Sequence, residues 1–171
     1  MADRRHPNVV NLDELEGRPS STGARFGYTS KGLGAATGSQ GVGCSFYDQP
    51  PGKTAFPRHW HAANEEAVFV LEGEGTAHIG ERKVAVRAGD YVTFLVGPDG
   101  AHMIVNTGNV PLRYLCFSTL KTPEVVGYPD SGKVGASASP SVDAARAGQP
   151  WLRHLSRRKD AVDYYDGEDV G

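Results

Sequence analysis

The sequence lacks the long apolar runs and the charge excess that mark membrane and nucleic-acid-binding proteins. No run approaches the roughly 18 apolar residues of a membrane span, and the N-terminal segment has no apolar stretch of signal-peptide length. The formal net charge is −2, so the chain has no electrostatic footprint for nucleic acid or an anionic membrane. We therefore expect a cytoplasmic protein with no nucleic-acid or membrane partner.

Cysteine is also scarce, with only two residues among 171. Cys44 and Cys116 both lie in apolar, strand-like runs, where a reduced thiol packs as a small hydrophobe. We expect both to fill the core, although the sequence leaves a pairing of the two open.

Glycine and proline are instead abundant, at 22 and 11 residues, and indicate many turns. Between residues 41 and 120, short apolar runs alternate with turn sequences such as PPGK, EGEG and GPDG. This spacing predicts an all-β fold in which eight strands close into a small double-stranded jelly-roll β-barrel. The expected strands are residues 43–49, 55–61, 66–73, 75–81, 83–89, 91–97, 102–108 and 112–119.

The segments on either side of this body have a different composition. Residues 1–40 contain few large apolar side chains and are interpreted as an N-terminal arm or leading loop. Residues 121–171 are interpreted as a linker followed by a tail that combines a basic cluster with acidic and aromatic residues. That tail either packs along the barrel or across a dimer, or it is a solvated terminus, and the sequence leaves both open.

A group of histidines and glutamates is the main candidate for a functional site. Side chains alternate faces along a strand, so His59 and His61 point to the same side. Glu66 shares a face with Val68 and Val70, which is the better candidate for the barrel interior.

A carboxylate in an apolar interior is costly unless a cation or hydrogen bonds compensate it, and a divalent metal ion would do so. His102, on a distant strand after a tight turn, can supply a further ligand. A hydrogen-bonded, partly exposed histidine pair is the alternative, but the combination of all four residues favours metal binding. Such a ligand set suits Mn, Fe, Co, Ni or Zn without choosing among them.

These motifs resemble those of the cupin superfamily. The first cupin motif is matched by Gly52, His59, His61, Glu66 and Gly73, and the second by Gly89, Pro98, Gly100, His102 and Asn106. One residue separates Gly100 from His102 where the family pattern has two, and two other spacings lengthen loops. The wider chain is similar to single-domain cupins of type 2 labelled sugar-phosphate-isomerase-like. The resemblance implies a small β-barrel with His59, His61, Glu66 and His102 as metal ligands inside one mouth, and a homodimer.

A metal centre with open positions predicts an enzyme that acts on a small polar molecule by isomerisation, epimerisation or lyase chemistry. With Fe(II), the same site would suit a dioxygenase, and a non-catalytic small-ligand-binding or structural cupin dimer is a further alternative.

No catalytic acid or base is assigned by the sequence. Strand parity directs Glu65 away from Glu66, and it directs Phe56, Arg58 and Trp60 away from His59, toward the barrel exterior or a subunit contact. Tyr47 and Gln49 can reach the barrel mouth, or Asp48 can if the register slips by one. We expect Asn106 to support the His102 loop by side-chain hydrogen bonds rather than to contact substrate, and His6, His78 and His154 are given no role.

Overall fold

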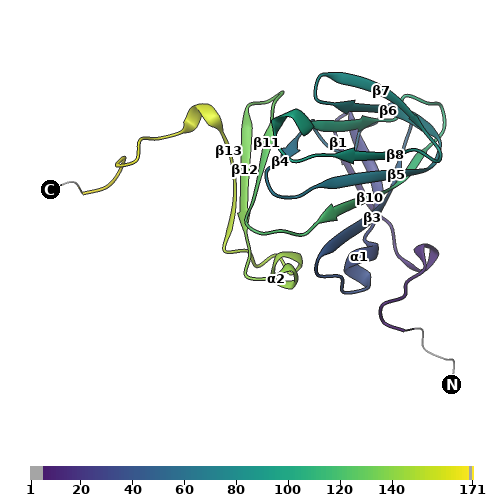
Figure 1. Ribbon diagram of the computed structural model, residues 1–171, viewed down its shortest axis with the longest axis horizontal. Helices are drawn as coiled ribbons and strands as arrows, with labels where there is room; N and C mark the ends of the chain where they lie inside the picture. Colours follow the sequence, from purple (N-terminus) through teal and green to yellow (C-terminus); the bar gives the residue numbers. More distant parts are fainter. Residues whose placement is uncertain (1–5, 170) are drawn as a thin grey trace.

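The computed structural model describes residues 6–169 and 171, so residues 1–5 of the predicted arm and residue 170 of the tail lie outside it (Figure 1). A six-stranded antiparallel sheet with the order β1-β2-β3-β10-β5-β8 forms one side of the body. Its strands are β1 (Arg18–Thr22), β2 (Phe26–Lys31), β3 (Val42–Gln49), β10 (Leu112–Thr119), β5 (Glu66–Glu72) and β8 (Tyr91–Phe94).

A three-stranded antiparallel sheet with the order β7-β6-β9 packs against it. Its strands are β7 (Arg82–Arg87), β6 (Glu74–Ile79) and β9 (His102–Val105). The buried core lies between the two sheets, with Val70 and Leu112 from one and Ala77 and Val86 from the other. Alternate residues of each strand enter this core because side chains in a strand point to opposite faces. The predicted all-β jelly-roll fold is confirmed.

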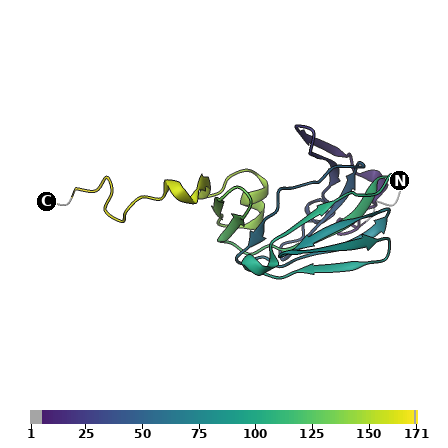
Figure 2. The same ribbon diagram turned by 90° about the horizontal axis from the view of Figure 1, so that it is seen from above.

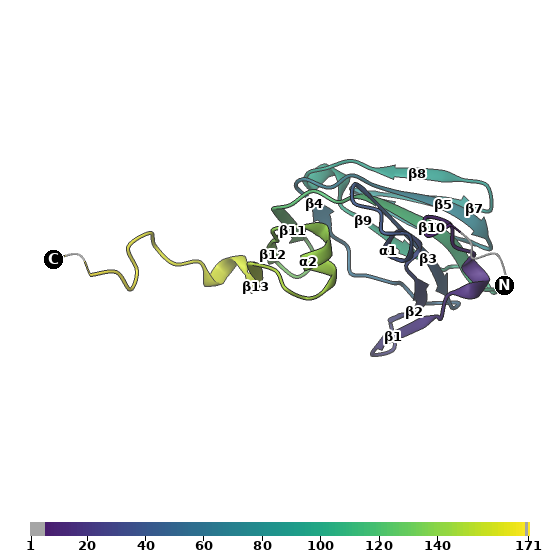
Figure 3. The ribbon, with the colours of Figure 1, turned by 90° about the horizontal axis from the view of Figure 1, so that it is seen from below.

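The N-terminal segment contains more regular structure than the sequence indicated. β1 and β2 form a hairpin that pairs with β3 and projects from the edge of the six-stranded sheet (Figure 3). The 3₁₀ turn η1 (Leu12–Glu14) precedes the hairpin, and the short helix α1 (Leu33–Ala36) follows it. All five residues of β1 are exposed, so backbone pairing rather than apolar burial defines this edge strand.

The segment after residue 121 also contains strands where a linker was expected. A separate four-stranded sheet has the order β13-β12-β11-β4. It consists of β13 (Leu152–Arg157), β12 (Lys133–Ala138), β11 (Glu124–Tyr128) and the two-residue strand β4 (Trp60–His61). The C-terminal segment therefore holds the strand that carries one of the candidate ligands.

The remaining short helices lie at the ends of strands. The 3₁₀ turn η2 (Pro98–Gly100) precedes β9, helix α2 (Val142–Arg146) lies between β12 and β13, and the 3₁₀ turn η3 (Arg158–Asp160) follows β13. Beyond η3 the chain runs away from the body (Figures 1 and 2). Among the described residues, no helix is long and apolar enough to cross a membrane.

Gly127 on β11 allows β4 to pack closely. Trp60 is its partner across the strand pair, and a Cβ atom at position 127 would lie 2.1 Å from Cε2 of the Trp60 indole. Such an overlap requires the indole or the strand to move, and Trp60 lies between His59 and His61 in the chain. Because Gly127 has no side chain, the Trp60 indole can pack against β11 and hold the segment that contains the histidine pair.

We expect Gly127→Ala to lower the free energy of unfolding by about 1–3 kcal/mol, because overpacking displaces the indole. Gly135→Ala on the neighbouring β12 is the matched control, since its Cβ would lie 3.5 Å from the nearest atom, at ordinary contact distance. Urea unfolding of both variants measures the difference. Equal stability of the two would show that the Trp60 contact does not limit β4 packing.

Candidate metal centre

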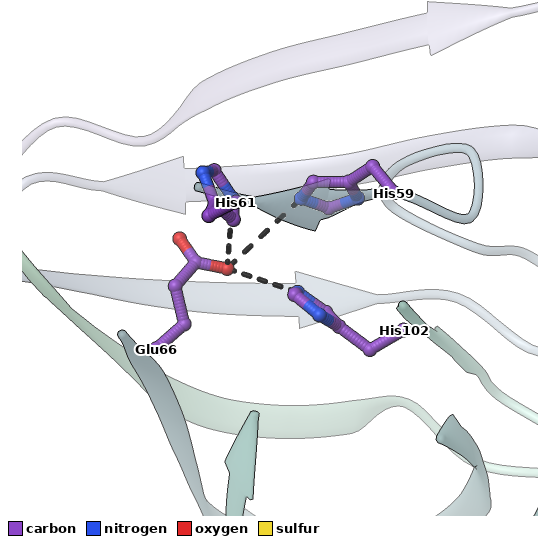
Figure 4. A group of neighbouring side chains, drawn as sticks. All are labelled: His59, His61, Glu66 and His102. Carbon is purple, nitrogen blue, oxygen red and sulfur yellow. Dashed lines mark hydrogen bonds and ion pairs between the residues drawn. The ribbon is translucent and has the colours of Figure 1, made fainter. Parts of the chain in front are cut away.

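The four candidate side chains converge on one point inside the barrel (Figure 4). Their donor atoms all lie within 4.8 Å of one another. Glu66 Oε2 is 3.0 Å from His102 Nε2, 3.6 Å from His61 Nε2 and 4.0 Å from His59 Nε2. The structure thus brings together all four residues that the sequence selected.

Backbone pairing sets the positions of these ligands. His59 and His102 form an isolated antiparallel bridge, in which each backbone N–H donates to the other residue's carbonyl at 3.1 and 2.8 Å. His61 is held by the pairing of β4 with β11, and Glu66 begins β5, between β8 and β10. Three of the clustered side chains therefore come from three different sheets, and His59 comes from the bridge to His102.

Gly100 explains how His102 keeps its place despite the shortened spacing in the second motif. A Cβ atom on Gly100 would lie 1.8 Å from the carbonyl oxygen of Leu95, so only glycine permits this close turn. The next strand then begins at His102, whose ring stacks on Phe94 with centroids 4.0 Å apart. The tight turn and the stacked ring together fix the imidazole.

Hydrogen bonds to backbone carbonyls orient two of the imidazoles. His59 Nδ1 donates to the carbonyl of Pro57 and His102 Nδ1 to the carbonyl of Gly100, both at 2.9 Å. A neutral imidazole has one N–H, so each Nε2 then presents a lone pair to the centre of the cluster. This orientation is the one that metal-binding histidines adopt.

The centre of the cluster needs a positive charge. The lone pair of a neutral His102 and the carboxylate of Glu66 are both acceptors, yet their atoms lie 3.0 Å apart, so a proton or a cation must lie between them. Both ring nitrogens of His61 are buried without a hydrogen bond in the described part of the chain. The donor set therefore fits a divalent metal ion.

The pKa values reflect the same electrostatics. Burial, assisted by His102, lowers the pKa of His59 to about 4. Burial alone would raise the pKa of Glu66, but the facing rings of His102 and His61 outweigh it and hold this pKa well below its usual range. Burial would lower the pKa of His61, yet Glu66 and Glu124 raise it. At neutral pH the cluster thus contains a carboxylate, a neutral imidazole and a position that favours positive charge.

Glu124, at the start of β11, is a further component that the sequence analysis missed. It is buried, and Glu124 Oε2 lies 3.4 Å from His61 Nδ1, on the side of the ring opposite Glu66. Its oxygens accept hydrogen bonds from four backbone N–H groups, those of Ala62, Ala63, Asn64 and Val125, and from the Asn64 side-chain amide. A carboxylate behind a ligand histidine fixes the ring and increases its basicity.

The segment from Ala55 to His59 departs from the expected strand. The predicted strand 55–61 is reduced to Trp60 and His61, because Pro57 has no N–H for a ladder. Strand parity therefore fails before His59, and Phe56 lines the cavity while 38% of its surface remains exposed. Arg58 points outward as expected, in ion pairs with Glu81 and Asp130.

The other residues considered near the mouth have distinct positions. Tyr47 reaches the cavity, whereas Asp48 forms an ion pair with Arg113 at 2.9 Å. Gln49 is fully buried and donates to the carbonyls of Lys53 and Ile104. Glu65 is exposed, as parity predicts.

Asn106 and the two cysteines have structural environments. The Asn106 side chain donates to the carbonyls of Gln49 and Val110 and accepts from the Gly108 N–H, so it braces the turn after β9, the strand that begins at His102. It lies outside the cavity lining, and its role is structural, as expected. Cys44 and Cys116 are both free and partly buried on neighbouring strands. Cys116 packs against the core as predicted, whereas Cys44 lies outside the core cluster.

The four clustered residues line a cavity of about 250 Å³. The cluster forms one end of it, and apolar and aromatic side chains form the rest. The lining residues are Tyr47, Ala55, Phe56, His59, His61, Glu66, Val68, Phe94, His102, Met103, Ile104, Tyr114 and Cys116.

Comparison with known proteins places this architecture in a family. The model of the cupin domain matches residues 45–118, which contain the barrel strands and all four clustered residues. These residues form a cupin domain. The double-stranded β-helix fold of cupins accordingly describes the body of the protein.

Two solved cupin structures share the fold over almost the whole chain. A proposed sugar phosphate isomerase from Acidithiobacillus ferrooxidans superimposes with a TM-score of 0.76 at 24% identity, covering 92% of this chain and 96% of that one. A sugar phosphate isomerase of the cupin superfamily from Silicibacter pomeroyi gives a TM-score of 0.74 at 22% identity, covering 92% and 98%. Their coverage includes segments outside the matched cupin domain.

A curated relative provides a closer but shorter match. An uncharacterised protein of Methanocaldococcus jannaschii is 42% identical over 60 residues, which is 35% of this chain. The match spans 46% of that relative, less than half of its length.

We expect Glu124→Ala to destabilise the metal-free protein by more than about 3 kcal/mol, because the backbone N–H groups of Ala63, Asn64 and Val125 lose this acceptor and each costs about 1–3 kcal/mol when unpaired. The exposed Glu65→Ala variant is the control and should change stability by less than about 0.5 kcal/mol. Urea unfolding in the presence of a chelator separates this effect from metal binding. A small effect of Glu124→Ala would mean that water replaces the carboxylate.

Proposed function

We propose that His59, His61, Glu66 and His102 hold a divalent metal ion and that the protein is a metal-dependent enzyme. The proposal rests above all on the arrangement of the donor atoms, since three Nε2 atoms and one carboxylate oxygen converge in the lining of one cavity. Mn, Fe, Co, Ni and Zn all accept such ligands.

The proposed substrate is a small molecule that carries a sugar diol, hydroxy-carbonyl or carboxylate group. A bound metal ion would supply Lewis acidity to an oxygen of this group. The barrel residues contribute in other ways: Glu66 provides negative charge, Glu124 orients His61, and the apolar walls exclude water from the reacting atoms. Isomerisation, epimerisation and lyase reactions all use these features.

Tyr47 is the candidate for a proton-holding group in the cavity. Burial raises the pKa of its phenol above the usual range, with smaller contributions from Cys116 and Tyr28. The phenol is therefore neutral and able to donate a hydrogen bond at neutral pH. We propose that it binds a substrate oxygen rather than acting as a base.

The two solved structures named as sugar phosphate isomerases support the fold more than the reaction, at 24% and 22% identity. Fold alone does not determine chemistry, which resides in the site. The reaction class proposed for this chain therefore rests on the metal cluster and the cavity.

Metal content tests the proposal first. We expect wild-type protein incubated with each candidate metal and then gel-filtered to retain about one ion per chain. His61→Ala and Glu66→Ala should weaken binding by more than about 100-fold, because loss of an outer partner alone costs 10–100-fold. His78→Ala and Glu65→Ala are the matched controls and should bind like wild type.

The identity of the retained metal directs the second measurement. Oxygen consumption by the iron-loaded protein with a chelating substrate would indicate a dioxygenase, and its absence together with product formation would indicate non-redox chemistry. If folded wild-type protein retains none of the five metals, the enzyme proposal is wrong, and a ligand-binding or structural role remains.

A further inference from the structure

The wall of the cavity facing the metal cluster consists of packed aromatic rings. Tyr47 stacks on Tyr114 with ring centroids 5.3 Å apart, and Phe56 meets Tyr47 edge-on at 5.7 Å. Outside this layer, Tyr28 of the N-terminal hairpin contacts both Tyr47 and Phe56, at 5.3 and 5.2 Å. The rings are therefore fixed by packing before any ligand binds.

Apart from the Tyr47 hydroxyl, which is proposed above to bind an oxygen of the metal-bound end of the ligand, the polar groups in this part of the cavity are engaged. The Tyr114 hydroxyl donates to Gln49 Oε1 at 3.2 Å, and the Cys116 thiol is directed to the carbonyl of Phe117. Glu66 is the only side chain among the lining residues with a fixed charge, and it is negative. The nearby Arg25 lies behind Met103, with its guanidinium 3.5 Å from the sulfur.

The size of the cavity sets a further limit. A volume of about 250 Å³ is close to the lower end of the roughly 300–1,000 Å³ that is typical of small-molecule pockets. The cavity therefore suits a small organic ligand. A phosphate dianion against this wall would also be buried without a cationic partner.

From these observations we infer that the ligand has two unlike ends, an inference that rests on the proposed metal site. One end is a 2-oxo or 2-hydroxy carboxylate that chelates the metal ion. The other end is short, uncharged and apolar, and it packs against Phe56, Tyr47 and Tyr114. The substrate class is thus a small apolar-tailed oxo or hydroxy acid, and phosphorylated sugars are disfavoured.

Calorimetric titration of metal-loaded protein tests this inference with defined probes. We expect 4-methyl-2-oxopentanoate, which has a branched apolar tail, to bind at least about tenfold more tightly than pyruvate, which has the same head. Phe56→Ala should remove most of this difference, measured as the ratio of the two affinities in the same metal-loaded variant. Tyr91→Ala, at an exposed aromatic residue outside the cavity lining, is the control and should bind both acids like wild type.

Other outcomes would overturn the inference without affecting the metal site. Tighter binding of dihydroxyacetone phosphate or fructose 6-phosphate than of the branched acid would contradict it, as would equal binding of the two oxo acids or no binding of either. Metal content, measured on the same samples, distinguishes these results from failure of the proposed metal site itself.

The C-terminal arm carries a second, independent inference. The segment 151–159 contains Arg153, Arg157, Arg158 and Lys159, and it includes β13, the outermost strand of its sheet. Trp151, Leu152 and Leu155 of the same segment are exposed, at 77%, 48% and 56%. This surface combines positive charge, apolar area and an unpaired strand edge, which together favour a binding partner.

The segment that follows has the complementary composition. Residues 160–169 contain five acidic residues and no basic one, together with Val162, Tyr164 and Tyr165. Among the described residues, those from 162 to 169 make hydrogen bonds and ring contacts only with one another and with Gly171, and the segment extends away from the barrel (Figure 2). We also propose that residues 160–169 of one copy lie along β13 of a second copy, reciprocally, in a symmetric dimer.

The length of the arm is sufficient for this contact. Ten residues in extended conformation reach up to about 33 Å, and the six residues of β13 span about 20 Å. The acidic side chains would then lie near the arginines of the other copy, with the tyrosines over its exposed leucines. Tyrosine is enriched at such interfaces because its ring is apolar and its hydroxyl remains hydrated.

Light scattering coupled to gel filtration tests the dimer. We expect wild type to have twice the chain mass of 18.2 kDa, and a variant truncated after Lys159 to be monomeric. Tyr164→Ser with Tyr165→Ser should weaken association at least tenfold, whereas Tyr91→Ser, at an exposed tyrosine of the barrel, should not. A truncated protein that remains dimeric, or a monomeric wild type at about 100 μM, would overturn the proposal.

Discussion

The site depends on one constraint, the burial of the Glu66 carboxylate beside three imidazoles at the end of an apolar cavity. An ion taken from water into such surroundings is unfavourable unless opposite charge or hydrogen-bond donors compensate it. The histidines supply only part of this, because the Nδ1 hydrogens of His59 and His102 are directed to backbone carbonyls. The same bonds leave the Nε2 lone pairs of His59 and His102 directed toward Glu66. Lone pairs cannot neutralise a carboxylate, so this geometry favours a cation at the centre of the cluster.

That geometry requires three sheets to meet at one end of the barrel. The six-stranded sheet supplies Glu66, the three-stranded sheet supplies His102, and the C-terminal sheet holds His61 through the pairing of β4 with β11. Glu124 links the last of these to the cluster, since its carboxylate binds the turn after β4 and also faces His61. Segments far apart in sequence therefore determine the orientation of one imidazole.

The sequence was most informative where side-chain alternation governs a regular strand. Parity placed Glu66 with Val68 and Val70 on the inner face and Glu65 outside, because β5 is a continuous strand with a buried face. The same argument failed for Phe56, since the proline that follows interrupts the ladder. Glu124 was not predicted because its partners are backbone N–H groups about 60 residues away, and no side-chain pattern marks them.

The strands outside the cupin domain were missed for a related reason. β1 and β13 have largely exposed side chains, so they form by backbone pairing at a sheet edge, and the sequence shows no alternation of apolar residues that would predict them.

The positions of these outer strands nevertheless bear on function. The hairpin places Tyr28 behind the aromatic wall of the cavity, and the C-terminal sheet supports His61. A ligand that binds the folded state stabilises it in proportion to its affinity, so a metal ion held between these sheets would also strengthen their association. A bound metal ion would thus couple the terminal segments energetically to the site, even though none of the four clustered residues belongs to them.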